Sequence, residues 1–316
     1  MQNRIRQIDY LKCVFIVLMI IFHLVYVGNK YPYVKQIVYT FHMPAFLIIS
    51  GYLANMDKGL GKVLRQIKWL LVPYAVMEAG YIYMASLLPI REHIDTLTAG
   101  VFMDRLLLHP LGPYWYLHTL IICYIVYYAV NRLRPRLGVA GEMCVMGIIM
   151  YVLDELPGLV SLSNSMYFMA GALIRQCGVK LTTAFSPTLL AAVPFVMFCT
   201  VSPGGLDRST LQGVTMTWLA ISLALAVYKY LGAKTRTVTH FIGENTLAIL
   251  LFSPMFTIIA KQFVPIFSFD PTAMLFTVVS VAFTLAGSMT VAYVMDRLKL
   301  SRWFSGKPLY NKYAGG

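Results

Sequence analysis

Residues 14–27 read VFIVLMIIFHLVYV, an apolar run that a single histidine, His23, interrupts. A second apolar stretch, FHMPAFLIISGY at 41–52, has His42 at its start. An ionisable side chain held in hydrocarbon is energetically costly, so its presence there indicates a function. The two stretches therefore predict membrane-spanning helices that carry proton-transfer chemistry.

The composition of the chain is typical of an integral membrane protein. Of its 316 residues, 59% are hydrophobic and only 12% are charged, whereas soluble proteins carry about 25% charged residues. The formal net charge of +13 can indicate nucleic-acid binding, but membrane topology explains it without a nucleic acid. The five cysteines are scattered singly, which predicts neither a disulfide framework nor a metal site.

The hydrophobic pattern predicts an all-α polytopic membrane protein. About 20 apolar residues cross a bilayer as a helix, and this criterion selects 11–28, 35–55, 69–88, 113–131, 138–153, 159–174, 185–201, 210–231, 240–260 and 271–294. We expect a bundle of about ten transmembrane helices, with residues 1–316 forming a single transmembrane domain. We also expect a short amphipathic helix at 101–108 and an interfacial anchor at 301–304.

The distribution of the basic residues predicts how these spans are oriented in the membrane. If the N-terminus is cytoplasmic, the inner segments hold most of the 26 Lys and Arg residues. The outer segments hold only Lys30, Lys35, Arg91, Arg105, Arg208 and Lys261. This bias predicts that both termini are cytoplasmic and that the basic excess faces the headgroups of membrane lipids.

Asp9, Lys12 and His23 are expected to share one face of the first helix. Asp9 precedes Lys12 by three residues, a spacing that allows an ion pair. Lys12 and His23 are eleven residues apart, which is about 16 Å along a helix axis. Histidine takes and returns a proton near neutral pH, so His23 is the candidate general base. The alternative is a histidine that only bonds a neighbouring backbone carbonyl.

Other ionisable and aromatic residues are candidates for the site. His42 is expected in the first turn of the second helix together with Pro44, as a second acid or base or as a substrate ligand. Glu78 would orient a histidine or bridge helices. Trp115 and His118 lie one turn apart and would face one cavity, although a membrane aromatic belt also explains the tryptophan.

Arg65 and Lys68 lie three residues apart on the expected cytoplasmic side. Basic residues at this spacing share a helix face and can bind phosphates, but every inner loop is expected to be basic. Ser50, Gly51 and Tyr52 near the inner end of the second helix have an ordinary explanation, because small residues allow close helix packing.

Six blocks, in this order along the chain, resemble the acyltransferase-3 family of membrane O-acyltransferases, in particular its fucose-4-O-acetylase-like and polysaccharide O-acetylase members. The blocks are 9–12 with His23, 41–46 with 50–53, 65–73, 114–117, 167–171 and 243–247. The first two blocks are specific to the family, whereas the later ones are weak alone. Three positions depart from the family pattern, which has arginine in place of Lys12 and Lys68 and histidine in place of Ser253.

The resemblance implies an O-acetyltransferase in the bacterial inner membrane. The donor would be acetyl-CoA from the cytoplasm, and the acceptor a hydroxyl of a glycan or lipid-linked sugar. His23 would be the essential histidine. The CoA phosphates would bind Arg65 and Lys68, with Lys12 at the channel mouth.

The remaining candidates complete this scheme. Asp9 would hold Lys12, while His42, Trp115 and His118, together with Glu78, would shape the acceptor side. No metal is implied.

Two other functions remain open on the sequence. A glycolipid or sugar transporter or flippase would also have ten helices and few buried charges, although transporters commonly show inverted repeats and none is detected. The three departures instead suggest an inactive family member within a glycan-assembly complex. A homo-oligomer is compatible with either function.

Overall fold

The computed structural model describes residues 5–56, 59–87, 92–156 and 158–311. The chain is 79% helix, and its described residues form no strand. Four of the basic residues counted for the orientation, Arg4, Lys58, Arg91 and Lys312, lie outside the described residues. The all-α fold class is confirmed.

Within the described residues, six helices are long and apolar enough to cross a membrane, by length and composition alone. They are α3 (Pro32–Leu53), α4 (Leu60–Leu87), α7 (Arg134–Glu155), α11 (Leu211–Tyr228), the continuous segment Thr246–Phe263 and α14 (Met274–Arg297). The other expected spans form shorter or broken helices. Ten spans with cytoplasmic termini stay a prediction.

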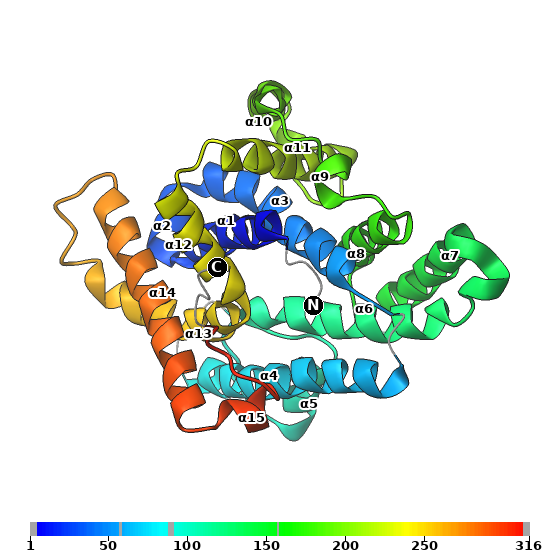
Figure 1. Cartoon of the computed structure of the whole chain (residues 1–316). Coiled ribbons are helices and arrows are strands. Elements are labelled where there is room, and N and C mark those ends of the chain that lie inside the picture. The colour runs from blue at the N-terminus through cyan, green and yellow to red at the C-terminus, as the bar shows by residue number, and fades with distance from the viewer. Residues whose placement is uncertain (1–4, 57–58, 88–91, 157, 312–316) are drawn as a thin grey trace. The chain divides into compact units, whose positions relative to one another are not determined.

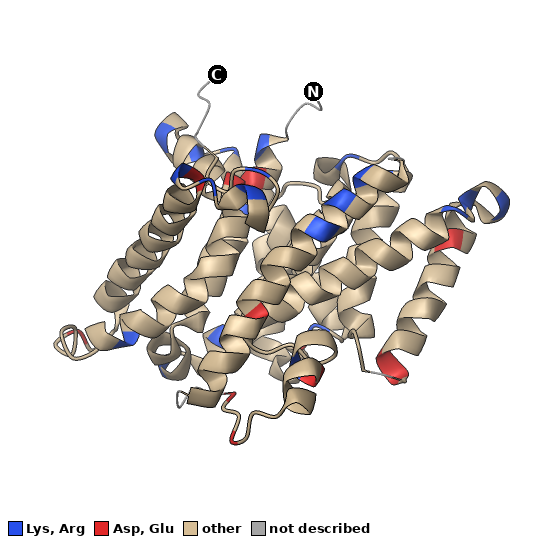
Figure 2. Cartoon of the chain, turned by 90° about the horizontal axis from the view of Figure 1, so that it is seen from below, with Lys and Arg blue, Asp and Glu red and all other residues tan. Residues whose placement is uncertain are grey.

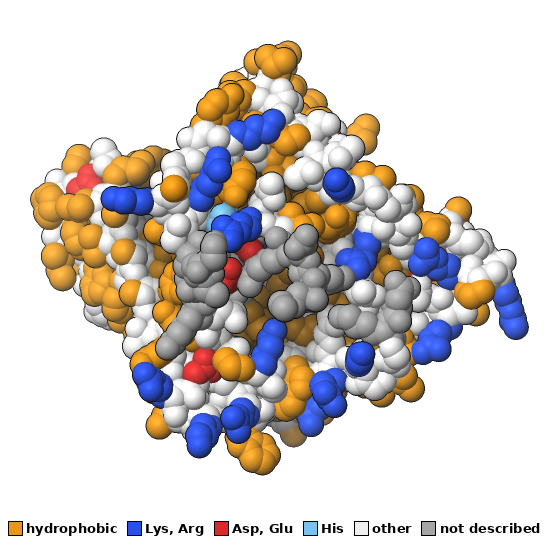
Figure 3. Space-filling model, in the orientation of Figure 1, with side chains coloured by type: hydrophobic (Ala, Val, Ile, Leu, Met, Phe, Trp, Pro, Cys, Tyr) orange, Lys and Arg blue, Asp and Glu red, His pale blue; other side chains and the backbone are white. Residues whose placement is uncertain are grey.

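Charged residues lie mainly at the ends of the helices. Figure 2 shows blue and red segments concentrated at helix ends and in the connections, with mostly tan helix shafts between them. Figure 3 shows Lys and Arg side chains exposed on one face, with few acidic side chains beside them. Helices of this kind keep their charges out of hydrocarbon, as membrane-spanning segments must.

The chain divides into two compact units. The first unit comprises Met1–Phe46, Lys180–Trp303 and Lys307–Gly316, and the second comprises Leu47–Val179 and Phe304–Gly306. The α3 helix contributes residues to both units, because the division falls inside it. That residues 1–316 act as a single transmembrane domain stays a prediction.

The first unit is organised around α1 (Arg6–His23), which packs against α11, α12 and α13 (Figure 1). Its other elements are α2 (Val25–Lys30), α9 (Leu181–Ala184), η2 (Leu189–Ala191), α10 (Ala192–Val201), η3 (Pro203–Gly205), α12 (Ala233–Glu244), α13 (Thr246–Ile259), η4 (Ala260–Phe263) and α14. One side of α1 is fully buried, including Leu11, Phe15, Ile16 and Ile20. This burial holds α1 in place and so positions its polar residues.

The second unit is built from helices that pack mainly on their neighbours in sequence. Its elements are the end of α3, α4, α5 (Ala99–Leu107), η1 (Gly112–Tyr114), α6 (Trp115–Asn131), α7 and α8 (Leu162–Gln176). The helix predicted at 101–108 is confirmed as α5. Near the C-terminus, the segment 301–304 forms α15 (Ser301–Phe304), and its Trp303 is 84% exposed.

Two glycines bring the end of α3 and α8 together. A Cβ atom on Gly51 would overlap the Phe168 carbonyl oxygen, and one on Gly171 would overlap the Ile48 carbonyl oxygen. Only glycine allows backbones to approach this closely. The explanation of Gly51 as a packing residue is therefore confirmed, and Gly171 is its partner.

The prediction of one continuous helix at 11–28 is wrong. The α1 helix ends at His23, Leu24 is extended with φ −67° and ψ 101°, and α2 begins at Val25. Leu24 is buried against Val27, Ala260 and Phe276. The break lets Leu24 fill this cluster, and it makes His23 the last residue of α1.

The prediction that His42 and Pro44 lie in the first turn of a helix is also wrong. The α3 helix begins at Pro32, so both residues lie near its middle. Proline suits the first turn of a helix because its missing N–H would have no partner there. Pro32 meets that condition, whereas Pro44 is accommodated inside α3.

Candidate functional site

Asp9 and Lys12 form the predicted ion pair at the start of α1. The Lys12 Nζ atom lies 2.8 Å from Asp9 Oδ1, with 19% and 6% of the respective side chains exposed. Asp9 is in the first turn of α1, where a carboxylate also interacts favourably with the helix dipole. The pair is confirmed, whereas its role toward a donor stays a prediction.

The α12 helix packs directly on this pair through Gly243. A Cβ atom on Gly243 would overlap the Asp9 carbonyl oxygen and lie 2.9 Å from Asp9 Cα. Two residues after Gly243, Asn245 accepts a hydrogen bond of 2.9 Å from the amide of Asn311 and donates to the Phe241 carbonyl at 2.8 Å. The block 243–247 therefore has a packing and anchoring role.

Sequence reasoning missed His240, which is buried one turn before Gly243. Its Nε2 atom lies 3.1 Å from the Tyr228 hydroxyl, and the Tyr228 ring lies 5.1 Å from that of Tyr10. The Arg236 guanidinium lies 4.8 Å from the same Tyr228 ring. The spacing of His240 from Gly243 could have indicated it, because residues three apart share a helix face.

His23 is half-buried at the end of α1. Its Nδ1 atom lies 2.7 Å from the carbonyl oxygen of Met19. Because a carbonyl can only accept, Nδ1 carries the proton, and the lone pair of the neutral ring lies on Nε2. A general base needs such a lone pair, so the backbone contact and the catalytic role are compatible.

Tyr39 lies near both His23 and His42. Its ring centroid is 6.1 Å from that of His23 and 5.2 Å from that of His42. The Tyr39 hydroxyl donates to the Phe22 carbonyl at 3.2 Å, and Lys35 Nζ lies 5.3 Å from the ring centroid. The structure thus brings the two predicted histidines into one cluster, with Tyr39 and Lys35 as members that the sequence did not reveal.

His42 has the same tautomer as His23. Its Nδ1 atom lies 2.7 Å from the Val38 carbonyl oxygen, which leaves the lone pair on Nε2. The side chain is 2% exposed, and Nε2 has no hydrogen-bond partner among the described residues. A buried polar atom of this kind is uncommon and suits a group that meets a substrate.

In the second unit, Glu78 anchors a backbone segment. The carboxylate is fully buried, and its Oε1 atom accepts a hydrogen bond of 2.6 Å from the Leu111 amide. Its Oε2 atom has no partner among the described residues. Of the two roles considered, the bridging role is the one that the geometry favours, because Glu78 ties α4 to the residue before η1.

Trp115 and His118 have different neighbours. The Trp115 ring lies 6.4 Å from the Tyr116 ring, whereas the His118 ring lies 5.6 Å from the Tyr74 ring. His118 Nε2 also donates to the Leu107 carbonyl at 2.8 Å. Their common acceptor cavity stays a prediction.

Arg65 and Lys68 are exposed one turn apart on α4. The Lys68 ammonium lies 4.8 Å from the Trp69 ring centroid, a cation–π distance. The predicted residues thus form two groups. The first unit holds Asp9, Lys12, His23 and His42, and the second holds Arg65, Lys68, Glu78, Trp115 and His118.

Comparison with known proteins identifies the family. The acyltransferase-3 family, described as an acyltransferase domain, matches residues 5–293 of the 316-residue chain. No curated protein matches the chain, and no solved structure matches it. The matched range includes each predicted site residue. The chain therefore belongs to the acyltransferase-3 family, and with its long apolar helices it is a membrane acyltransferase.

Proposed function

We propose that this protein transfers an acetyl group from cytoplasmic acetyl-CoA to a hydroxyl of a cell-envelope sugar, as part of a glycan or a lipid-linked intermediate. The family supports acyl transfer, and the apolar helices support a membrane location, for which we propose the bacterial inner membrane. The observation that carries the proposal is the match of the acyltransferase-3 family to residues 5–293, which include His23. The hydrogen bond of 2.7 Å between His23 Nδ1 and the Met19 carbonyl is compatible with the role of His23 as the base.

This bond prepares His23 to act as the general base. With Nδ1–H held by the carbonyl, Nε2 accepts the proton of the sugar hydroxyl while the hydroxyl oxygen attacks the thioester carbonyl. A carbon–oxygen bond forms and the carbon–sulfur bond breaks. The thiolate of CoA then takes the proton from the imidazolium, which restores neutral His23.

The surroundings of His23 suit a substrate. The ring is half-buried at the break between α1 and α2, and the Tyr39 ring lies near both His23 and His42. The Nε2 atom of His42 is a buried acceptor that can receive a sugar hydroxyl hydrogen bond. We assign His42 to the acceptor side.

The basic residues would bind the donor. Phosphate groups are bound by arginine and lysine side chains, and Arg65 and Lys68 are both exposed on α4. The Asp9–Lys12 pair would stand at the entrance for the pantetheine arm. Lysine keeps the positive charge that the family pattern has at positions 12 and 68 but lacks the bidentate fork of arginine.

The test is an acetyl-transfer assay with labelled acetyl-CoA, purified full-length protein and a cell-envelope extract, in which mass spectrometry identifies the modified glycan. His23→Gln should lower transfer by at least about a hundredfold, because it removes the general base. His93→Gln, a substitution of another histidine on a connecting segment, is the matched control and should retain transfer.

Two results would contradict the proposal. Retained transfer in His23→Gln, with an unchanged unfolding midpoint, would remove His23 from the mechanism. CoA-independent movement of a glycolipid in proteoliposomes, without acetyl transfer, would instead favour a transporter.

A further inference from the structure

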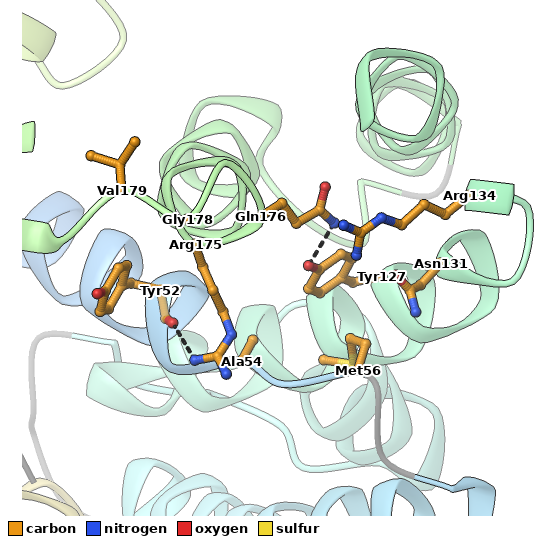
Figure 4. A pocket seen from close by; sticks show the side chains of 10 residues that line it. All are labelled: Tyr52, Ala54, Met56, Tyr127, Asn131, Arg134, Arg175, Gln176, Gly178 and Val179. Atoms are coloured by element: carbon orange, nitrogen blue, oxygen red, sulfur yellow. Dashed lines mark hydrogen bonds between the residues drawn. The ribbon is translucent and has the colours of Figure 1, made fainter. Parts of the chain in front are cut away.

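The second unit contains a polar cavity that none of the predicted site residues lines. Its volume is about 440 Å³, and it lies among the C-terminal ends of α3, α6 and α8 and the start of α7. Polar lining residues are Tyr52, Tyr127, Asn131, Arg134, Arg175 and Gln176. Figure 4 shows the side chains of both arginines at this cavity.

Arg175 is held in place by a backbone group. Its Nη1 atom donates to the Tyr52 carbonyl at 3.1 Å, at the end of α3. A guanidinium has five N–H donors in a planar fork, so this bond leaves further donors for a ligand. Arg175 is therefore an oriented cation at the cavity wall.

Arg134 is oriented by a buried carboxylate. Its Nε atom lies 4.0 Å from Glu142 Oε2, and the Glu142 side chain is fully buried. Gln176 Nε2 donates to the same Glu142 oxygen at 2.9 Å and to the Tyr127 hydroxyl at 2.8 Å. This network holds the side chains around Arg134 in one arrangement before any ligand arrives.

The charge of the cavity favours an anion. Arg134 and Arg175 carry two positive charges, and the Glu142 carboxylate compensates only one of them. Among the residues that the structure describes, none that lines the cavity is acidic. Paired guanidinium groups bind phosphate oxygens through charge-assisted, often bidentate hydrogen bonds.

We propose that this cavity binds the phosphate group of a larger ligand, with Arg134 and Arg175 as the phosphate ligands. Its volume is in the range of small-molecule sites and exceeds what one phosphate needs. The aromatic rings of Tyr52 and Tyr127 can pack against the rest of the ligand. A soluble nucleotide such as CoA and an anionic phospholipid share this chemistry.

Binding measurements on the full-length protein in phosphatidylcholine nanodiscs test the proposal. The soluble probes are inorganic phosphate, CoA and 3′-dephospho-CoA. Arg134→Gln and Arg175→Gln should each weaken the binding of a phosphate-bearing probe by about tenfold or more, because each removes a charge-assisted hydrogen-bond donor. Arg136→Gln removes the same charge two residues from Arg134, outside the cavity, and should stay within about twofold of the unaltered protein.

The probes distinguish the two sources of phosphate. If CoA is the ligand, it should bind more tightly than 3′-dephospho-CoA or inorganic phosphate, and this preference should shrink in both cavity variants. If a lipid is the ligand, phosphatidylglycerol in the nanodisc should compete with the soluble probes. Native mass spectrometry should then find that lipid retained by the unaltered protein and lost from Arg175→Gln.

One outcome overturns the proposal: both cavity variants bind every probe, and retain phosphatidylglycerol, as the unaltered protein does. Arg175→Gln leaves the Glu142 network intact, so it tests the site even if Arg134→Gln folds poorly. The binding assay is also independent of acetyl transfer. His23→Gln should bind the probes normally whether or not the proposed reaction is correct.

Discussion

Gly243 lies directly against the backbone of Asp9, so closely that a Cβ atom on Gly243 would overlap the Asp9 carbonyl oxygen. Through this contact α12 reaches the turn of α1 that carries the Asp9–Lys12 ion pair. The absence of a side chain at Gly243 therefore determines how closely the two helices approach. It also determines where the Asp9 carboxylate is held.

Gly243→Ala should separate α12 from α1, because backbone atoms of Asp9 occupy the space of the new methyl group. We expect the free energy of unfolding to fall by about 1–3 kcal/mol, as for other overpacked sites, and acetyl transfer to fall with it. Thermal unfolding in detergent measures the change in stability, and the transfer assay measures the change in acetyl transfer. Gly80→Ala is the control, since among the described residues nothing beyond its chain neighbours and the nearby backbone of its own helix lies within 4 Å of its Cβ position. Equal stability of the two variants would contradict the prediction.

Lys12→Ala should destabilise the protein, because it removes the ammonium partner of the buried Asp9 carboxylate. Removing one partner of a buried ion pair costs about 3–5 kcal/mol, and the 19% exposure of Lys12 places the expected loss at the low end. Lys12→Arg keeps the charge and should retain most of the stability and transfer. Chemical denaturation and the transfer assay check this, and a loss in Lys12→Arg as large as in Lys12→Ala would show that the ion pair is not the cause.

Glu78→Gln should leave stability and transfer nearly unchanged, because the amide oxygen can still accept the hydrogen bond from the Leu111 amide. Glu78→Leu removes the acceptor and should cost about 1–3 kcal/mol. Thermal unfolding of the two variants distinguishes an anchoring role from a chemical one. If Glu78→Gln abolished transfer at normal stability, the ionised carboxylate would be part of the site.

Ionisation of Asp270, in the connection before α14, should make the stability of the folded protein depend on pH. Hydrogen bonds from the Thr272 side chain, the Leu275 amide and the Thr272 amide lower the pKa of its carboxyl group. Because the pKa is lower in the folded state, the stabilisation is present above the pKa of the unfolded chain. It is lost as the pH falls through the folded pKa.

Unfolding midpoints of the unaltered protein and of Asp270→Asn, measured from pH 7 down to pH 3, test this dependence. The unaltered protein should be the more stable at pH 7, and the difference should narrow toward pH 3. A constant difference across the range would show that ionisation of Asp270 does not contribute.

Much of the helical architecture was predictable, because long apolar runs and helical spacing are local properties. The helix α7 covers the whole span expected at 138–153, and α4 and α14 cover most of the spans expected at 69–88 and 271–294. The Asp9–Lys12 pair was predictable for the same reason, since residues three apart meet on any helix. Family membership likewise follows from sequence blocks alone.

The two wrong predictions concern the helix boundaries near His23 and His42, which the local sequence pattern does not indicate. The segment around Leu24 contains neither proline nor glycine, yet the helix breaks there because Leu24 fills a cluster with Ala260 and Phe276. His42 was placed in a first turn because Pro44 follows it. Pro32 is the proline that begins the helix.

The sequence by itself determined a helical membrane acyltransferase, the first-turn ion pair and the identity of the candidate base. Apolar composition indicates the membrane helices, and short-range spacing indicates the ion pair. The acyltransferase assignment rests instead on the resemblance of the sequence blocks to the family. Only the tertiary structure decided that Gly243 contacts Asp9, that Tyr39 stands near His23, and that Arg134 and Arg175 line one cavity. Each of these contacts joins residues distant in the chain, so it depends on how whole helices pack rather than on any local pattern.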